Sequence, residues 1–94
     1  MMFNDRIKQL REDRQMPQRK LAVVWDIDTA SYCKIERGER RARKEYILVI
    51  AEFLQGDREE LLTLWLSDQV TAMVVDEKEL SSKVLNIAKQ NINQ

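Results

Sequence analysis

The side chains best suited to chemistry in this chain are basic, and they are unevenly distributed. The net charge is zero, yet residues 1–44 hold twelve Lys and Arg against seven Asp and Glu, whereas residues 45–94 hold four against nine. A run of RRARK at residues 40–44 concentrates the positive charge. Basic side chains pair with phosphates, so the first half could follow a nucleic-acid backbone while the acidic half stays clear of it. The alternative is a solvated surface with a chance charge gradient.

The sequence offers little for catalysis. It contains no His, which is the commonest metal ligand and near-neutral proton shuttle, and its one Cys, Cys33, has no base nearby in sequence. Cys33 could sense oxidants, but an inert, semi-buried or surface thiol is the simpler interpretation. Acidic residues near positions 57–60 and 76–79 fit the first turns of helices better than a catalytic pair. We therefore expect a protein that is not an enzyme and that uses neither a metal nor a cofactor.

Helical periodicity accounts for the chain, and no β-alternation of useful length occurs. Pro17 suits the first turn of a helix, Asp28 suits an N-cap, and Gly38 and Gly56 suit helix ends. The expected helices cover residues 4–14, about 17–25, 29–36 and 44–54, with a fifth beginning at Asp57 and a sixth at Asp76. The predicted fold class is all-α, with a four-helix unit at residues 1–56 and a helical extension at 57–94.

Apolar residues at helical spacing provide a core for the first unit. The expected core residues are Ile7, Leu10, Leu21, Ala22, Ile27, Ile35, Ile47, Ile50 and Leu54. Trp25 and Trp65 could stack on bases, but each lies on an apolar helical face, which favours packing in the core.

Three segments occur together at fixed offsets: QRKLA at 18–22, WDID at 25–28 and IERG at 35–38. Together they resemble the helix-turn-helix of the lambda-repressor-like, xenobiotic-response-element (XRE) family over residues 4–55. In that family a Gln opens the second helix, a Leu-Ala pair follows, and a Glu-x-Gly sequence ends the recognition helix. The chain departs from the pattern at Asp26, where the family commonly has a left-handed glycine. Glu36 is expected to pair with Arg11 or Arg14.

The resemblance implies which residues read bases. By position in the family's recognition helix, Thr29, Ala30 and Lys34 would face the major groove of double-stranded DNA, with Ser31 beside them. Lys34 could donate to guanine O6 and N7, and Thr29 could bond several base edges.

The resemblance also implies phosphate contacts. Gln18 would meet a phosphate at the start of the second helix, and basic residues after the recognition helix would hold the backbone on the other side. These residues are Arg37, Arg40, Arg41 and Arg43. The alternative for each arginine is an ordinary solvated loop.

The extension carries more apolar residues than one stripe against its own domain requires. We expect a homodimer, with contacts from Leu62, Trp65, Leu66, Val70 and Met73. The alternative is that the sixth helix folds back over the fifth within one chain.

These features together predict a dimeric transcriptional regulator, a repressor or autoregulator, that binds a pseudo-palindromic operator. A second interpretation is an antitoxin-like subunit whose last two helices hold a protein partner, with DNA binding secondary. A structural helical adaptor is a third. The chain shows neither a membrane span nor the start of a secretory signal, so we expect a cytoplasmic protein.

Overall fold

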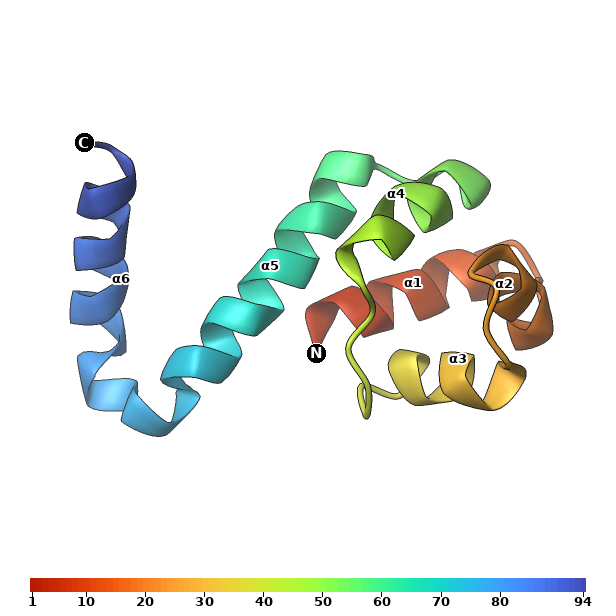
Figure 1. Cartoon of the computed structure of the whole chain (residues 1–94), viewed down its shortest axis with the longest axis horizontal. Helices are drawn as coiled ribbons and strands as arrows, with labels where there is room; N and C mark the ends of the chain where they lie inside the picture. Colours follow the sequence, from red (N-terminus) through yellow and green to blue (C-terminus); the bar gives the residue numbers. More distant parts are fainter.

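The computed structural model describes residues 1–94, and every regular element in it is a helix (Figure 1). The helices are α1 (Met2–Asp13), α2 (Gln18–Val24), α3 (Thr29–Glu36), α4 (Lys44–Phe53), α5 (Arg58–Val74) and α6 (Lys78–Ile92), with a single 3-10 turn, η1 (Val75–Glu77), before α6. The prediction of an all-α fold is confirmed, and the expected helix bounds are close to those observed. No helix is long and apolar enough to cross a membrane.

The first four helices end in the same way. Each is followed by one residue with a left-handed backbone, and these residues are Gln15 (φ 53°), Asp26 (55°), Gly38 (80°) and Gln55 (52°). At the end of α3 the Gly38 amide donates to the Ile35 carbonyl and the Glu39 amide to the Lys34 carbonyl, so two terminal carbonyls are satisfied. The predicted end of α3 at Gly38 is therefore confirmed.

Two of the expected helix signals lie elsewhere. Gln55, not Gly56, is the left-handed residue after α4, and a Cβ at Gly56 would make a tight contact of 3.2 Å with Leu10 Cδ1. Pro17 is the N-cap of α2 and not part of its first turn, since its ψ of 153° is extended.

The core lies between α1, α2, α3 and α4 and is closed by the first half of α5. Eight of the nine expected core residues are buried, and Ile27 is half-buried against them. Trp25 is buried as predicted, with its ring stacked on Tyr46 at a centroid distance of 4.9 Å and its indole N–H donating to the Tyr46 carbonyl at 3.1 Å. These aromatic rings fill the space under the turn that leads into α3.

The beginning of α5 belongs to this bundle. Leu61 is wholly buried in the same core, and Glu60 pairs with Arg6 of α1 at 2.6 Å. Asp68 accepts hydrogen bonds from the backbone amides of Met2 (3.1 Å) and Phe3 (2.9 Å), so a side chain of α5 caps the start of α1. The packing boundary therefore lies inside α5, some residues beyond the expected division at 56.

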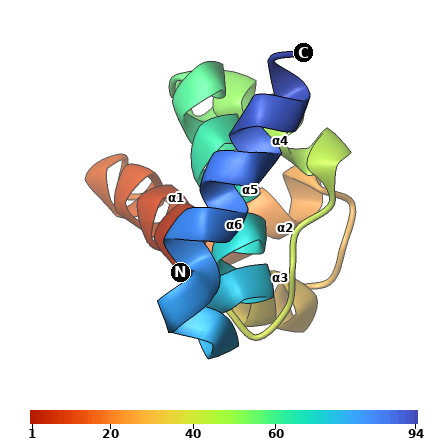
Figure 2. The same ribbon diagram turned by 90° about the vertical axis from the view of Figure 1, so that its left-hand side faces the viewer.

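The rest of the chain, residues 66–92, leads away from the bundle, with Asp68 and Gln69 near its start still hydrogen-bonded to the bundle, and we call it the C-terminal arm. α5 and α6 diverge from the short turn that joins them, and α6 lies on the outer side of α5 in both views (Figures 1 and 2). No residue of α6 is buried. Helix six thus does not fold back over helix five to cover it.

Candidate nucleic-acid interface

The connection between α2 and α3 is a tight turn built without glycine. Asp26 adopts the left-handed conformation there, and the amides of Asp26 and Ile27 donate to the carbonyls of Val23 and Ala22, both at 3.0 Å. Asp28 then caps α3 by accepting a hydrogen bond from the Ser31 amide at 2.6 Å, and this bond lowers the pKa of the Asp28 carboxyl. The departure at Asp26 leaves the expected turn geometry intact.

α3 has two different faces. Its inward face carries Tyr32 and Ile35, both buried in the core. Its outward face carries Thr29, Ala30 and Lys34, all exposed. Ser31 lies at the edge of that face and is half-buried. The three outward residues are among those expected to reach base edges, and each has a side chain that is accessible to solvent.

Glu36, at the end of α3, is held by three other side chains. Its carboxylate accepts two hydrogen bonds from Arg11 (2.9 and 2.7 Å), one from the Tyr32 hydroxyl (2.6 Å) and one from the Gln18 amide (3.1 Å). The expected pairing is therefore with Arg11, whereas Arg14 donates to the Leu10 carbonyl.

This network sets the charge state of its members. Burial opposes ionisation of Glu36, but the hydrogen bonds from Arg11, Tyr32 and Gln18 outweigh it and hold the pKa of the carboxyl below its usual range. The hydrogen bond to Glu36 likewise raises the pKa of Arg11, and burial raises that of Tyr32. An ionised carboxylate thus joins α1, α2 and α3 and fixes the angle at which α3 stands on the bundle.

Gln18 lies in a different setting from the one expected. Its amide nitrogen donates to Glu36, and its amide oxygen accepts a hydrogen bond from the Cys33 thiol at 3.0 Å. Both ends of the side chain are therefore engaged inside the motif. The position of Gln18 in the motif did not predict these hydrogen bonds, because both partners, Glu36 and Cys33, lie on the next helix, α3. Cys33 is half-buried on α3.

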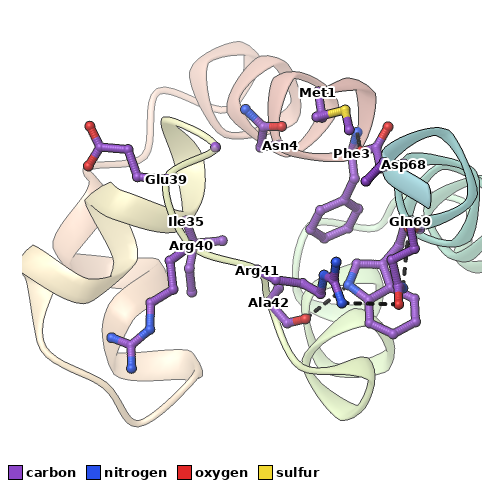
Figure 3. A pocket seen from close by; sticks show the side chains of 13 residues that line it. Met1, Phe3, Asn4, Ile35, Glu39, Arg40, Arg41, Ala42, Asp68 and Gln69 are labelled. Carbon is purple, nitrogen blue, oxygen red and sulfur yellow. Dashed lines mark hydrogen bonds between the residues drawn. The ribbon is translucent and has the colours of Figure 1, made fainter. Parts of the chain in front are cut away.

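The basic loop after α3 exposes all four expected arginines. Arg40 reaches back to the Ser31 hydroxyl at 3.2 Å, while Arg41 turns the other way and makes a long hydrogen bond of 3.4 Å to Gln69 of α5 (Figure 3). Arg37 pairs with Glu39 at 3.1 Å on the surface, and the side chain of Arg43 has no hydrogen bond or ion pair.

The loop is attached to the bundle between these arginines. Ala42 is buried, and its carbonyl accepts a hydrogen bond from the Trp65 indole at 2.9 Å. Arg40, Arg41 and Arg43 line one polar hollow together with Asp28 and Ser31 at the start of α3. The arginines therefore lie beside the helix whose outward face is free.

Two further basic residues were not among the expected contacts. Arg19 and Lys20 are both exposed in the first turn of α2. The positive charge of the first 44 residues could have identified Arg19 and Lys20 as candidate phosphate contacts. The motif, however, assigned only Gln18 at the start of α2.

The residues expected at a dimer interface divide into two groups. Leu62 and Trp65 are half-buried and pack against the core of their own bundle. Leu66, Val70 and Met73 are 46%, 42% and 82% exposed. Only the second group is free to meet another chain.

A family model described as a helix-turn-helix domain matches residues 3–64. No curated protein and no solved structure is significantly similar to the chain. The match covers about two thirds of the chain and ends inside α5, close to where the packing of the bundle ends. The chain therefore belongs to the helix-turn-helix domain family, a family of XRE and lambda-repressor-like regulators.

Proposed function

We propose that the protein is a cytoplasmic, sequence-specific transcriptional regulator that places α3 in the major groove of double-stranded DNA. The observation that carries this proposal is the contrast between the two faces of α3. Tyr32 and Ile35 fix the helix to the core, while Thr29, Ala30 and Lys34 are exposed beside a basic loop. A helix held rigidly from behind, with polar groups in front, is what direct readout of base edges requires.

The exposed residues have complementary chemistry. Lys34 donates to the O6 and N7 acceptors of guanine, and Thr29 offers both a hydroxyl for base edges and a methyl group for thymine. Ala30 contributes an apolar contact and leaves room for close approach. Ser31 acts through Arg40, whose guanidinium donates to its hydroxyl.

The phosphate contacts come from the basic loop. No rearrangement inside the bundle is needed for Arg37, Arg40 and Arg43 to contact a DNA backbone. Arg41 would only have to break its long hydrogen bond to Gln69. Gln18 serves instead as a positioning residue, because its amide holds Glu36 at the end of α3. Regulation would follow from occupancy of an operator, as a repressor or autoregulator.

The proposal includes a homodimer on a pseudo-palindromic operator. Two-fold symmetry would place two α3 helices on successive turns of the major groove, about 34 Å apart. The exposed apolar residues of the C-terminal arm support this assembly.

The same arm also supports a second candidate, an antitoxin-like subunit whose arm binds a different protein and whose DNA binding is secondary. The two candidates differ in the purified protein alone. The regulator assembles with itself, whereas the antitoxin-like subunit stays monomeric until its partner is added.

A salt titration of DNA binding tests the proposed interface. Anisotropy of a labelled duplex should show binding at low salt, and Arg43→Ala should lower the slope of log affinity against log salt by about one unit. Arg58→Ala is the matched control, since it removes the same charge at the start of α5, which lies on the opposite side of the bundle from α3 (Figure 1). The proposal fails if no duplex binds at low salt, or if both variants change the slope equally.

A further inference from the structure

The C-terminal arm exposes an apolar stripe on each of its two helices. Six residues form these stripes, and each is 42–82% exposed: Leu66, Val70 and Met73 on α5, and Leu80, Val84 and Ile87 on α6. Within both stripes the residues are separated by four and then three positions, which is the spacing of a coiled-coil seam. The α6 stripe was not among the residues expected to make dimer contacts.

The surface of the whole chain is too large for a protein of its size. The accessible surface is 6915 Å², whereas a folded monomer of 11.2 kDa exposes about 5,700 Å². The radius of gyration is 15.1 Å, against about 12.4 Å for a compact domain of this length. The excess of about 1,200 Å² is the surface that such a monomer would bury. Two chains that each buried this area would form an interface of about 2,400 Å², which is in the range of obligate homodimers.

We propose that the arm is covered by the arm of a second copy of this chain, and that the two arms form an intermolecular four-helix bundle. Each protomer contributes the second half of α5 and the whole of α6, with the six stripe residues facing inward. The inference deepens the homodimeric function proposed above and rests on it for its biological role. Its structural content is independent of DNA.

The charge of the arm is compatible with a second copy as the occupant and not with DNA. The arm carries four acidic and three basic residues, so two arms repel each other little, whereas a net negative arm does not attract DNA. Asn91 continues the α6 stripe four positions after Ile87. A polar residue at one position of an apolar seam fixes register and the number of chains.

The root of the arm is attached to the DNA-facing loop. The Trp65 indole donates a hydrogen bond to the Ala42 carbonyl, and the Gln69 side chain accepts one from Arg41. Trp65 lies just before the arm, and Gln69 lies in its first turn. A dimer formed through the arms would therefore hold the two basic loops, and the α3 helices beside them, in one relative orientation.

The test is the mass of the full chain in solution, by sedimentation equilibrium at tens of micromolar. The wild type should have twice the mass of the 11.2 kDa chain, and Val84→Glu with Ile87→Glu should have the mass of one chain. Ser82→Glu with Asn86→Glu adds the same charge on the other side of α6 and should remain dimeric. Neither pair touches the bundle core, because no α6 residue is buried, so the fluorescence of the two tryptophans, Trp25 in the core and Trp65 packed against it, reports an intact bundle in both.

Three results would overturn the proposal: a monomeric wild type, a dimer that survives the Val84 and Ile87 substitutions, or equal dissociation in the control pair. Leu48→Glu tests another exposed apolar site, on α4, and a dimer split only by that change would move the interface there.

DNA binding separates this inference from the proposed function. On a duplex selected by the wild type, the monomeric variant should bind at least a hundredfold more weakly than the wild type, because two linked half-sites gain about 10² to 10⁴ from effective concentration. On a single half-site the two proteins should bind alike. If the protein dimerises as described but binds no DNA, the proposed arm bundle is supported and the proposed function as a DNA-binding regulator is refuted.

Discussion

Replacing Glu36 with Gln is expected to destabilise the protein strongly although the change is nearly isosteric. The Glu36 side chain is 2% exposed and that of Arg11 is 12% exposed, so this ion pair is almost fully removed from water. Gln keeps one acceptor oxygen but turns an NH₂ group toward donors. Arg11 would then remain charged with its partner gone.

The size of the effect follows from burial and from the number of bonds lost. Breaking a buried pair by removing one partner costs about 3–5 kcal/mol. Arg11 keeps some solvent contact and a hydrogen bond to the Met16 carbonyl at 2.8 Å, which places the expected loss near 3 kcal/mol, the lower end of that range. A domain of this length has a free energy of unfolding of about 5–14 kcal/mol. The substitution should therefore remove a fifth to more than half of it.

Urea denaturation followed by circular dichroism measures this loss. The Val84→Glu and Ile87→Glu background makes unfolding independent of protein concentration, provided the arm bundle is as proposed. Glu60→Gln is the control, because its ion pair with Arg6 is equally short at 2.6 Å but 33–42% exposed, and such a pair contributes about 0–1 kcal/mol. The reasoning is refuted if Glu36→Gln costs no more than Glu60→Gln.

Three further outcomes are expected. Asp26→Gly should raise the free energy of unfolding by about 1 kcal/mol in urea denaturation, because glycine adopts the left-handed backbone without strain, and an unchanged or lower stability would contradict the turn geometry. Arg41→Ala should lower the salt slope of DNA binding by about one unit while Gln69→Ala leaves it unchanged, and the reverse pattern would assign Arg41 to the bundle alone. Stability should fall as pH drops below the ordinary Glu pKa of 4.5, because the unfolded chain then takes up a proton at Glu36 that the folded chain, with its lowered pKa, does not. Denaturation midpoints measured between pH 6 and pH 3 should show this fall, and Glu36→Gln should reduce the change of stability with pH.

Features of the fold that depend on local backbone chemistry were predictable from the sequence. Asp28 caps α3 and Gly38 ends it, as expected, because capping and left-handed closure involve only residues a few positions apart. The left-handed conformation at Asp26 also followed from its place in the motif. The exposure of Lys34 follows from the same local helix, since the neighbouring Tyr32 and Ile35 had to face the core.

Features that depend on packing between distant segments were not predictable in this way. Gln18 was expected to meet a phosphate, and its hydrogen bond to Glu36 was not foreseen because nothing nearby in sequence shows that Glu36 lies within 3.1 Å of its amide. The division at residue 56 followed the glycine there, but that glycine makes room for Leu10, and Leu61 beyond it enters the same core. Trp65 was expected at a dimer interface, whereas its indole N–H donates a hydrogen bond to the Ala42 carbonyl of its own chain. In each case a tertiary partner outweighed the local signal.

The measurement that tests the central claim most directly is a selection of bound fragments from random duplex DNA, carried out with the wild type, Lys34→Ala and Arg43→Ala. The wild type should enrich two inverted half-sites one helical turn apart, at a spacing of about 34 Å. Lys34→Ala should lose preference at one base pair in each half-site, at a cost of about 1–3 kcal/mol, while Arg43→Ala should enrich the wild-type motif with weaker binding throughout. No enrichment by the wild type, or an unchanged motif for Lys34→Ala, would contradict the account of α3 as the helix that reads DNA.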